Sequence, residues 1–585
     1  MYELSKIRLL LHILNWRLHW GSQNIHYPAP DLDNPKFVSP YAAASQIPDG
    51  SVIATSGLAA NQWAAILHWA IRASFENTGH PRNLTVVAIG GQGARGRVPG
   101  SLEELGLEGL CTRFFGGHLE TFKSYLRLAD AGKLELQCIP QGVLAHLIDG
   151  QGRGEDSWVT DTGVGTFVDP RVGRGTPLFT NQQHEQWVSV EGDKLRFRLP
   201  KIDVAIFNAP AADRHGNIYL KNCAIIAETF EIIRAARKNG GQVIANVGLL
   251  VEEGYDRIAV PAEDVDAVVY YPGTEQVASV PHRSYMPVFT TKSDMPREKG
   301  IALLRFVNEV LRITPVRRPI DTILARLAAS LFAESAPRGS LVNIGVGLPE
   351  EVCRVICEAG LYDDIKLFTE SGVIGGLPAP GVFFGTAVCP EKMISSLNAF
   401  KMCAERLDVS ILGVLQADSE GNVNVSKRGE GAINYVGPGG FIDFSTSART
   451  VIFVTSWMFN GKIASKNGRL HIDSQGKIKF VDQVDEITFS GKHALNKGTN
   501  VFFVTSVGVF QLTEQGMMLI RVMPGIDIQN DILRKCSMRI VLPESEVPVV
   551  ASSVVTGKNF RLNMKKLTDS ECTTEPWAGQ TGFII

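Results

Sequence analysis

The stretch DVAIFNAPAADRHGNIYL (Asp203–Leu220) aligns without a gap on a second stretch, DVSILGVLQADSEGNVNV (Asp408–Val425), and this repeat decides the fold. Each copy begins with an apolar run typical of a buried strand. It continues through an Asp-x-x-Gly-Asn turn into a second strand, because Asp and Gly-Asn favour tight turns. The repeat predicts two related halves.

A second pair of segments supports the repeat. Residues Gly50–Ala54 resemble residues Gly339–Asn343, and each run leads through a glycine-containing turn into a segment with helical spacing. Strands that alternate with helices form mostly parallel sheets. We therefore predict an α/β fold of two related open domains with mostly parallel sheets, and an active site at the interface between the domains.

The domain boundaries follow from the repeat and from a proline-containing join. We predict an amphipathic N-terminal extension, two domains of one plan, a linker between them and a tail: residues 1–30, 31–295, 296–318, 319–545 and 546–585. The first half also carries a predicted insertion, at roughly residues 95–174.

One carboxylate stands out, in the stretch Lys366-Leu-Phe-Thr-Glu370-Ser-Gly-Val-Ile-Gly-Gly376. A short apolar run breaks there into a glycine-rich loop, and ligands of open α/β sheets bind at the carboxyl ends of strands. A carboxylate at such a place can act as a nucleophile and form a covalent intermediate. Glu370 is therefore the first candidate for chemistry. The alternative is that it only accepts hydrogen bonds from loop amides.

The composition is typical of an ordinary soluble globular protein. The chain has 585 residues, of which 44% are hydrophobic and 20% charged, so more than one domain is expected. A formal net charge of -2 gives no reason to expect a nucleic-acid partner. No run is long and apolar enough to cross a membrane.

The cysteines and histidines indicate neither disulfides nor a metal. The 9 cysteines are irregularly spaced, as in an intracellular protein with reduced thiols. Cys353 and Cys357 are one helical turn apart, which favours a helix face over a metal site. The 12 histidines contain no His-x-x-x-His pair. We predict no metal.

The N-terminal segment has helical spacing. Leu4, Ile7, Leu11, Leu14 and Leu18 recur on one face, with basic residues among them. The segment could be a mitochondrial transit sequence, a surface anchor or a helix packed on the body of the protein. We favour the packed helix and a cytoplasmic protein. The mitochondrial matrix is the alternative if residues 1–20 act as a transit segment.

Ten short motifs, in order along residues 37–540, resemble those of family I coenzyme A-transferases, in the fused single-chain branch that includes propionate and acetate CoA-transferases. The motifs are Gly91-Gln92-Gly93, Glu108–Leu110, Gly116-Gly117-His118, Pro140–Val143, Gly163–Arg171, Asn343–Pro349, Glu370-Ser371-Gly372, Gly421–Lys427, Gly437–Phe441 and Pro524–Asp527.

The resemblance implies an acyl-CoA:carboxylate CoA-transferase that moves CoA between short-chain or branched carboxylic acids. Its nucleophile would be Glu370, the glutamate of the Glu-Ser-Gly motif. Ping-pong catalysis would proceed through a glutamyl-CoA thioester. The partners would be an acyl-CoA and a free acid, with no cofactor beyond CoA itself, and relatives associate as homo-oligomers.

The resemblance also assigns supporting residues. The backbone amides of Gly440 and Phe441 would stabilise oxyanions, with Gln92 as a donor from the other half. Asn424, Lys427, Gly437 and Gly439 would contact CoA. Lys427 and the neighbouring Arg428 could equally be a solvated turn, and Gly437–Gly440 could be a simple turn before a strand at Phe441–Phe444. We interpret His118 and His146 as structural.

Two departures from the family pattern bear on the substrate. Relatives have small residues where this chain has Trp457 and Met458, and a charged pair where it has Ser506 and Val507. We expect the acyl pocket or its surroundings to be reshaped there. Two other activities stay open: an acyl-CoA hydrolase that uses the same glutamate, and a catalytically silent CoA-binding protein.

Overall fold

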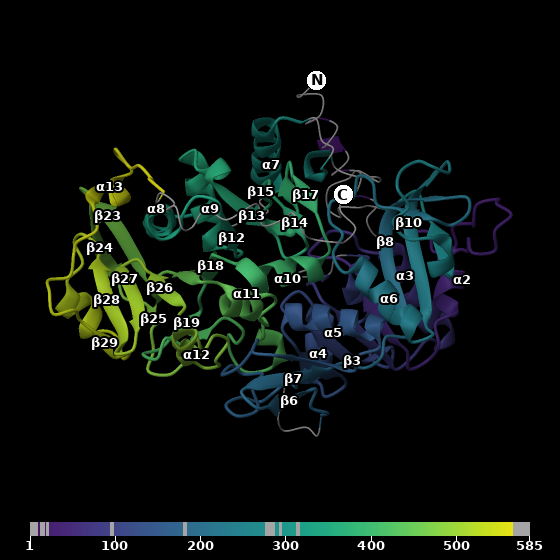
Figure 1. Cartoon of the computed structure of the whole chain (residues 1–585), viewed down its shortest axis with the longest axis horizontal. Coiled ribbons are helices and arrows are strands. Elements are labelled where there is room, and N and C mark those ends of the chain that lie inside the picture. Colours follow the sequence, from purple (N-terminus) through teal and green to yellow (C-terminus); the bar gives the residue numbers. More distant parts are fainter. Residues whose placement is uncertain are drawn as a thin grey trace.

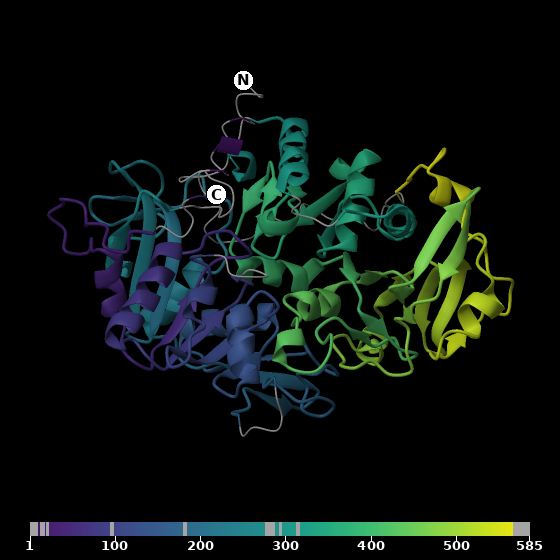
Figure 2. The same ribbon diagram turned by 180° about the vertical axis from the view of Figure 1, so that it is seen from behind.

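The computed structural model describes residues 23–93, 99–178, 184–274, 287–291, 295–311 and 316–564, and positions 7, 10, 11, 14 and 18. Two α/β halves lie side by side along the longest axis of the molecule, with α10 and α11 between them and next to α5 (Figures 1 and 2). The predicted fold class is confirmed.

The first half is built on an eight-stranded sheet in the order β11-β10-β8-β1-β2-β3-β4, with β9 beside β8. Every pair of neighbours is parallel except β8 and β9. The strands are β1 (Val52–Thr55), β2 (Leu84–Ala88), β3 (Cys111–Gly116), β4 (Glu135–Cys138), β8 (Val204–Asp213), β9 (Ile218–Tyr219), β10 (Gln242–Val251) and β11 (Ala267–Tyr270). The helices are α2 (Pro40–Ser45), α3 (Ala65–Thr78), α4 (Lys123–Asp130), α5 (Gln141–Arg153) and α6 (Thr229–Lys238).

The expected insertion at residues 95–174 is not a separate unit. It supplies β3 and β4 to the main sheet, and only β5 (Ser157–Thr160) joins a small antiparallel sheet with β6 (Val188–Glu191) and β7 (Lys194–Arg198).

The second half is built on a ten-stranded sheet in the order β17-β14-β13-β12-β18-β21-β26-β27-β28-β29. The run from β13 to β26 is parallel. The strands are β12 (Ser340–Ile344), β13 (Ile365–Phe368), β14 (Val373–Ile374), β17 (Lys392–Met393), β18 (Val409–Gly413), β21 (Thr450–Val454), β26 (Asn500–Val504), β27 (Gly508–Thr513), β28 (Gly516–Val522) and β29 (Ile540–Val541). The helices are α7 (Arg297–Leu311), α8 (Pro319–Ser335), α9 (Leu348–Glu358), α10 (Ser396–Arg406), α11 (Phe441–Ser447), α12 (Gly491–Asn496) and α13 (Ser552–Thr556).

Equivalent side chains make the same contacts in both halves, which confirms the repeat. Asp203 accepts a hydrogen bond from the Val52 amide at 2.8 Å, and Asp408 accepts one from the Leu341 amide at 2.8 Å. Each aspartate precedes the central strand, so it fixes the register between that strand and its parallel neighbour. The order β8-β1-β2 corresponds to β18-β12-β13.

The two Asp-x-x-Gly-Asn turns also have the same internal bonds. Asp213 accepts from the amides of residues 215 and 217, and Asp418 accepts from those of residues 420 and 422, all at 2.9–3.1 Å. The turn chemistry read from the sequence is thus present in both halves.

The prediction of a strand at Phe441–Phe444 is wrong, because these residues begin helix α11. Four consecutive mostly apolar residues do not separate a buried strand from a buried helix. The expected helix face at Cys353 and Cys357 is confirmed, since both residues lie in α9.

The N-terminal stripe is helical and exposed at the positions that the structure describes. Ile7, Leu11, Leu14 and Leu18 are 56–70% exposed. The prediction that this face packs on the body is therefore wrong. Within the described part of the chain, no helix is long and apolar enough to cross a membrane.

Candidate active site

Glu370 lies at the carboxyl end of β13, at the start of a tight loop that returns into β14. The Thr369 hydroxyl donates to the Gly385 carbonyl at 3.0 Å, and the hydroxyl of Ser371 donates to the same carbonyl. Gly372 has a φ of 93°, which favours glycine. The loop is held from both sides of the glutamate, so the side chain leaves a rigid backbone.

The Glu370 carboxyl is only partly exposed and is hard to ionise. Its enclosure by protein atoms raises its pKa to about 7. The carboxamide of Gln141, from the first residue of α5, lies beside it and offsets part of this rise without forming a fully aligned hydrogen bond. A carboxylate that is poorly solvated is a stronger nucleophile than one in water.

The glycine loop at residues 437–440 comes from the same half but is bound to the other half. The carbonyl of Val436 accepts from the amides of Leu119 and Glu120, at 2.7 and 3.0 Å. The Gly439 amide donates to the Gly117 carbonyl, and the Gly439 carbonyl accepts from the Gln141 amide, both at 3.0 Å. The interface between the halves therefore runs through the site.

Gly440 places backbone directly beside the Glu370 carboxyl. A β-carbon added at this residue would lie 3.2 Å from a Glu370 carboxylate oxygen and 2.7 Å from the Phe444 ring. The Phe441 amide donates to the Pro438 carbonyl at 2.9 Å, so it already has a partner. The backbone amides of Gly440 and Phe441 are the two predicted oxyanion donors. Within the described part of the chain, only the Gly440 amide donates no hydrogen bond.

The side-chain carboxamide of Gln92 is hydrogen-bonded within its own half of the molecule. The Gln92 oxygen accepts from the Thr55 hydroxyl and the nitrogen donates to the Thr55 carbonyl, both at 2.9 Å. The side chain beside Glu370 is that of Gln141. The sequence placed Gln141 in a family motif but assigned it no chemical role.

The residues predicted to contact CoA organise a turn. The Asn424 oxygen accepts from the amides of Ser426 and Lys427, and its nitrogen donates to the Lys427 carbonyl. The Lys427 ammonium pairs with Glu430 at 2.9 Å, and Arg428 pairs with Glu120 of the other half. The roles of these residues toward CoA stay a prediction.

His118 and His146 both pack against neighbouring groups, which favours the structural role predicted for them. The His146 ring stacks on Trp158 at a centroid distance of 4.0 Å, and burial lowers its pKa to about 4. The His118 ring lies against the backbone at Gly91, where it leaves no space for a β-carbon. Among the described residues, no group of three or more His, Cys, Asp or Glu side chains is arranged to hold a metal.

The two departures from the family pattern meet in the core. The Trp457 side chain is fully buried and stacks on Phe480 and Phe510, at centroid distances of 4.9 and 5.7 Å. Its backbone amide donates to the Ser506 hydroxyl at 3.0 Å. Trp457 thus fills the interior of the second half.

We expect Trp457→Ala to lower the free energy of unfolding by about 3–5 kcal/mol, because it removes a large buried ring and leaves a cavity. Urea unfolding followed by circular dichroism measures this change. The control is Phe459→Ala two residues away, where the side chain is 60% exposed and a change of about 0.5 kcal/mol or less is expected. Equal losses in the two variants would contradict a core role for Trp457.

Comparison with known proteins identifies the family. Residues 38–269 match the family model described as coenzyme A transferase. A caffeate CoA-transferase of Acetobacterium woodii is 33% identical over 510 residues, which cover 85% of this chain and 93% of that protein. The acetate CoA-transferase YdiF of Escherichia coli O157:H7 is 29% identical over 523 residues, which cover 87% of this chain and 93% of that protein.

A solved structure supports the same assignment. The crystal structure of the YdiF apoenzyme from E. coli O157:H7 superposes with a TM-score of 0.78 at 27% identity, covering 93% of this chain and 99% of that chain. At this coverage the match extends over both halves. The chain therefore belongs to the coenzyme A transferase family and is an enzyme that transfers CoA between an acyl-CoA and a carboxylate.

Proposed function

We propose that this transfer is a ping-pong reaction through a covalent intermediate on Glu370. The observation that carries the proposal is a poorly solvated carboxyl between the two halves, with a glycine backbone on one side and a free carboxamide on the other. This is the surrounding that nucleophilic catalysis by a carboxylate requires.

The proposed steps balance without an outside reagent. A Glu370 oxygen attacks the thioester carbonyl, the C–S bond breaks, and an anhydride and the CoA thiolate form. The thiolate then attacks the Glu370 carbonyl, so that a glutamyl-CoA thioester forms and the first acid leaves as its carboxylate. A second carboxylate takes CoA by the reverse sequence, and neither metal nor redox cofactor is needed.

Each attack places a negative charge on a carbonyl oxygen. We propose the Gly440 amide and the Gln141 carboxamide as the donors for these oxyanions, because both lie beside Glu370 and have no other well-formed partner among the described residues. Preorganised donors of this kind commonly contribute about 3–4 kcal/mol each to stabilising the transition state. Gln92 and Phe441 retain their predicted roles only if substrate binding frees their present bonds.

The substrate class rests on relatives. Acetate, in the name of one relative, is a short-chain acid, whereas caffeate, in the name of the other, is a larger aromatic acid. We propose that this enzyme accepts short-chain or branched carboxylic acids, in line with the relative named for acetate. Asn424, Lys427, Gly437 and Gly439 are proposed to line the path of CoA. We further propose a homo-oligomer in the cytoplasm, as expected from the sequence.

Mass spectrometry tests the intermediate directly. The purified enzyme is mixed with propionyl-CoA in the absence of an acceptor acid, and the intact mass is recorded. An adduct of the mass expected for CoA bound through an acyl linkage supports the glutamyl thioester. Steady release of free CoA without an adduct would instead favour a hydrolase, and no adduct or turnover over a panel of acyl-CoAs would favour a silent binder.

The pH profile follows from the state of the nucleophile. The pKa of Glu370 is raised to about 7, and only its ionised form attacks, so kcat/KM should fall about tenfold per pH unit below that value. The value of kcat/KM falls as the pH falls, because protonation removes the attacking carboxylate. It reaches its plateau above pH 7. Initial rates between about pH 5 and 9, with circular dichroism as a control for folding, give the profile. A rate that stays flat down to pH 5, as expected for the ordinary glutamate pKa of about 4.3, would contradict this surrounding.

A further inference from the structure

A carboxylate of the second half caps a helix of the first half. The Gly142 amide in the first turn of α5 donates to the Asp443 carboxylate of α11 at 3.0 Å. The residue before the helix, Pro140, makes no side-chain cap of its own. Capping oxygens and negative charge both stabilise a helix N-terminus. Here the cap comes from 301 residues away in the sequence.

The contact is tight and lies next to the nucleophile. Asp443 is only 7% exposed, and a β-carbon at Gly142 would lie 2.5 Å from its other carboxylate oxygen. The backbone amide of Gln141, the residue before Gly142, donates a hydrogen bond to the Gly439 carbonyl at 3.0 Å. The first turn of α5 is thus fixed against the glycine loop and α11 at two successive residues.

We propose that Asp443 is a positioning residue for the first chemical step: by capping α5 across the interface between the halves, it holds Gln141 beside Glu370. The proposal rests on the function of Glu370 proposed above. Asp443 does not need to touch the substrate, because it acts through the helix that carries Gln141.

The charges around Asp443 are consistent with this role. Burial raises its pKa to about 7, the Gly142 amide opposes the rise, and the nearby Glu370 adds to it. From α10, the buried Cys403 thiol also faces it, and Asp443 adds to the rise in that thiol's pKa. The nearby Glu370 carboxyl therefore disfavours ionisation of Asp443.

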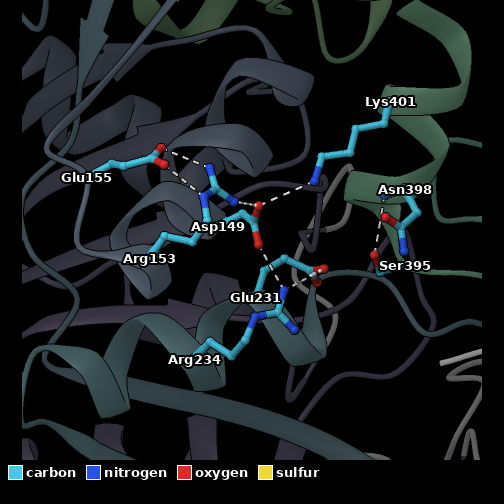
Figure 3. Close-up of polar contacts among 8 residues, drawn as sticks. All are labelled: Asp149, Arg153, Glu155, Glu231, Arg234, Ser395, Asn398 and Lys401. Atoms are coloured by element: carbon cyan, nitrogen blue, oxygen red, sulfur yellow. Dashed lines mark hydrogen bonds and ion pairs between the residues drawn. The ribbon is translucent and has the colours of Figure 1, made fainter. Parts of the chain in front are cut away.

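A second contact between the halves provides a matched control. Two turns along α5, Asp149 accepts from Arg234 of α6 at 2.9 Å and from Lys401 of α10 at 3.4 Å, and it also pairs with Arg153 (Figure 3). The Lys401 side chain is 43% exposed. Lys401→Met thus removes another bond from the second half to α5, this one from α10, without disturbing the first turn of α5.

The experiment measures how fast the adduct forms. Parent enzyme, Asp443→Ala, Asp443→Asn and Lys401→Met are mixed with propionyl-CoA, quenched at intervals and analysed by intact mass. A shift of Gln141 by about 1 Å should slow adduct formation in Asp443→Ala on the order of 100-fold. Asp443→Asn keeps one acceptor and should lose roughly tenfold. Lys401→Met should stay within about twofold, as expected for an exposed ion pair.

Two further readouts separate positioning from general stability. The loss in Asp443→Asn should lie in kcat with KM for propionyl-CoA nearly unchanged. The acid limb of its pH profile should move to higher pH, because the displaced Gln141 no longer lowers the pKa of Glu370.

Three results would overturn the proposal: adduct formation at the parent rate in Asp443→Ala, an equal loss in Lys401→Met, or a loss no larger than the unfolded fraction measured by circular dichroism. If the parent enzyme forms no adduct, the proposed function itself fails, which is a separate outcome.

Discussion

Replacing Glu370 with alanine is expected to lower CoA transfer by on the order of 10⁴-fold or more, because the covalent route loses its nucleophile. The adduct seen by mass spectrometry with propionyl-CoA should disappear in the same variant. Other family features would remain, since the Gly440 amide and Gln141 do not depend on the glutamate for their position. Activity would fall without loss of the fold.

Glu370→Gln is the control for shape. Glutamine keeps the size of the side chain and one acceptor oxygen but cannot form the anhydride. Enclosure raises the pKa of Glu370, so ionisation of this side chain destabilises the folded state. This cost grows as the pH rises above the ordinary glutamate pKa, and it is complete above pH 7. Glu370→Gln should therefore be at least as stable as the parent at pH 8. Transfer at the parent rate in either variant would remove Glu370 from the mechanism.

Gly372→Ala should nearly abolish activity and lower the free energy of unfolding by about 3 kcal/mol or more. Gly372 has a φ of 93°, and an added β-carbon would overlap the Ile394 carbonyl oxygen, which is backbone and cannot turn away. The loop must then move, and it carries Glu370 two residues earlier. Urea unfolding and the rate of adduct formation measure the two effects.

Gly375→Ala, just after β14, is the matched control at a second glycine of positive φ. Its φ is also positive, at 70°, but the β-carbon would meet the side chain of Glu391, which is 54% exposed and can swing into solvent. Only the backbone strain remains, at about 1 kcal/mol. If this variant lost as much activity as Gly372→Ala, the positive φ rather than the contact with Ile394 would explain both.

The repeat made the sheets predictable from the sequence. Asp203 and Asp408 precede matching strands, and the structure shows them making the same bond to a neighbouring strand. Apolar runs and turn residues are local signals, so they indicate where strands start and how they turn. The position of Glu370 at a strand end, beside the interface between the halves, was also predictable, because it lies in a short motif that follows an apolar run.

The neighbours of Glu370 were harder to predict, because contacts between the halves leave no periodic signal. Gln92 and Gln141 both lie near glycines, and nothing local tells which amide reaches across the interface. In the structure Gln92 is bound to Thr55, whereas Gln141 lies beside Glu370. The run Phe441–Phe444 was too short to separate helix from strand, so the cap that Asp443 provides stayed hidden.

The backbone bonds from Val436 and Gly439 to the first half have a consequence for how this enzyme fails. The reaction centre exists only while the two lobes are docked, and the buried apolar residues of both lobes form one continuous cluster. Under denaturing stress, catalysis would then be lost no later than the first loss of contact between the lobes. The two lobes must also evolve together, because a substitution at the interface in one lobe requires a compensating substitution in the other.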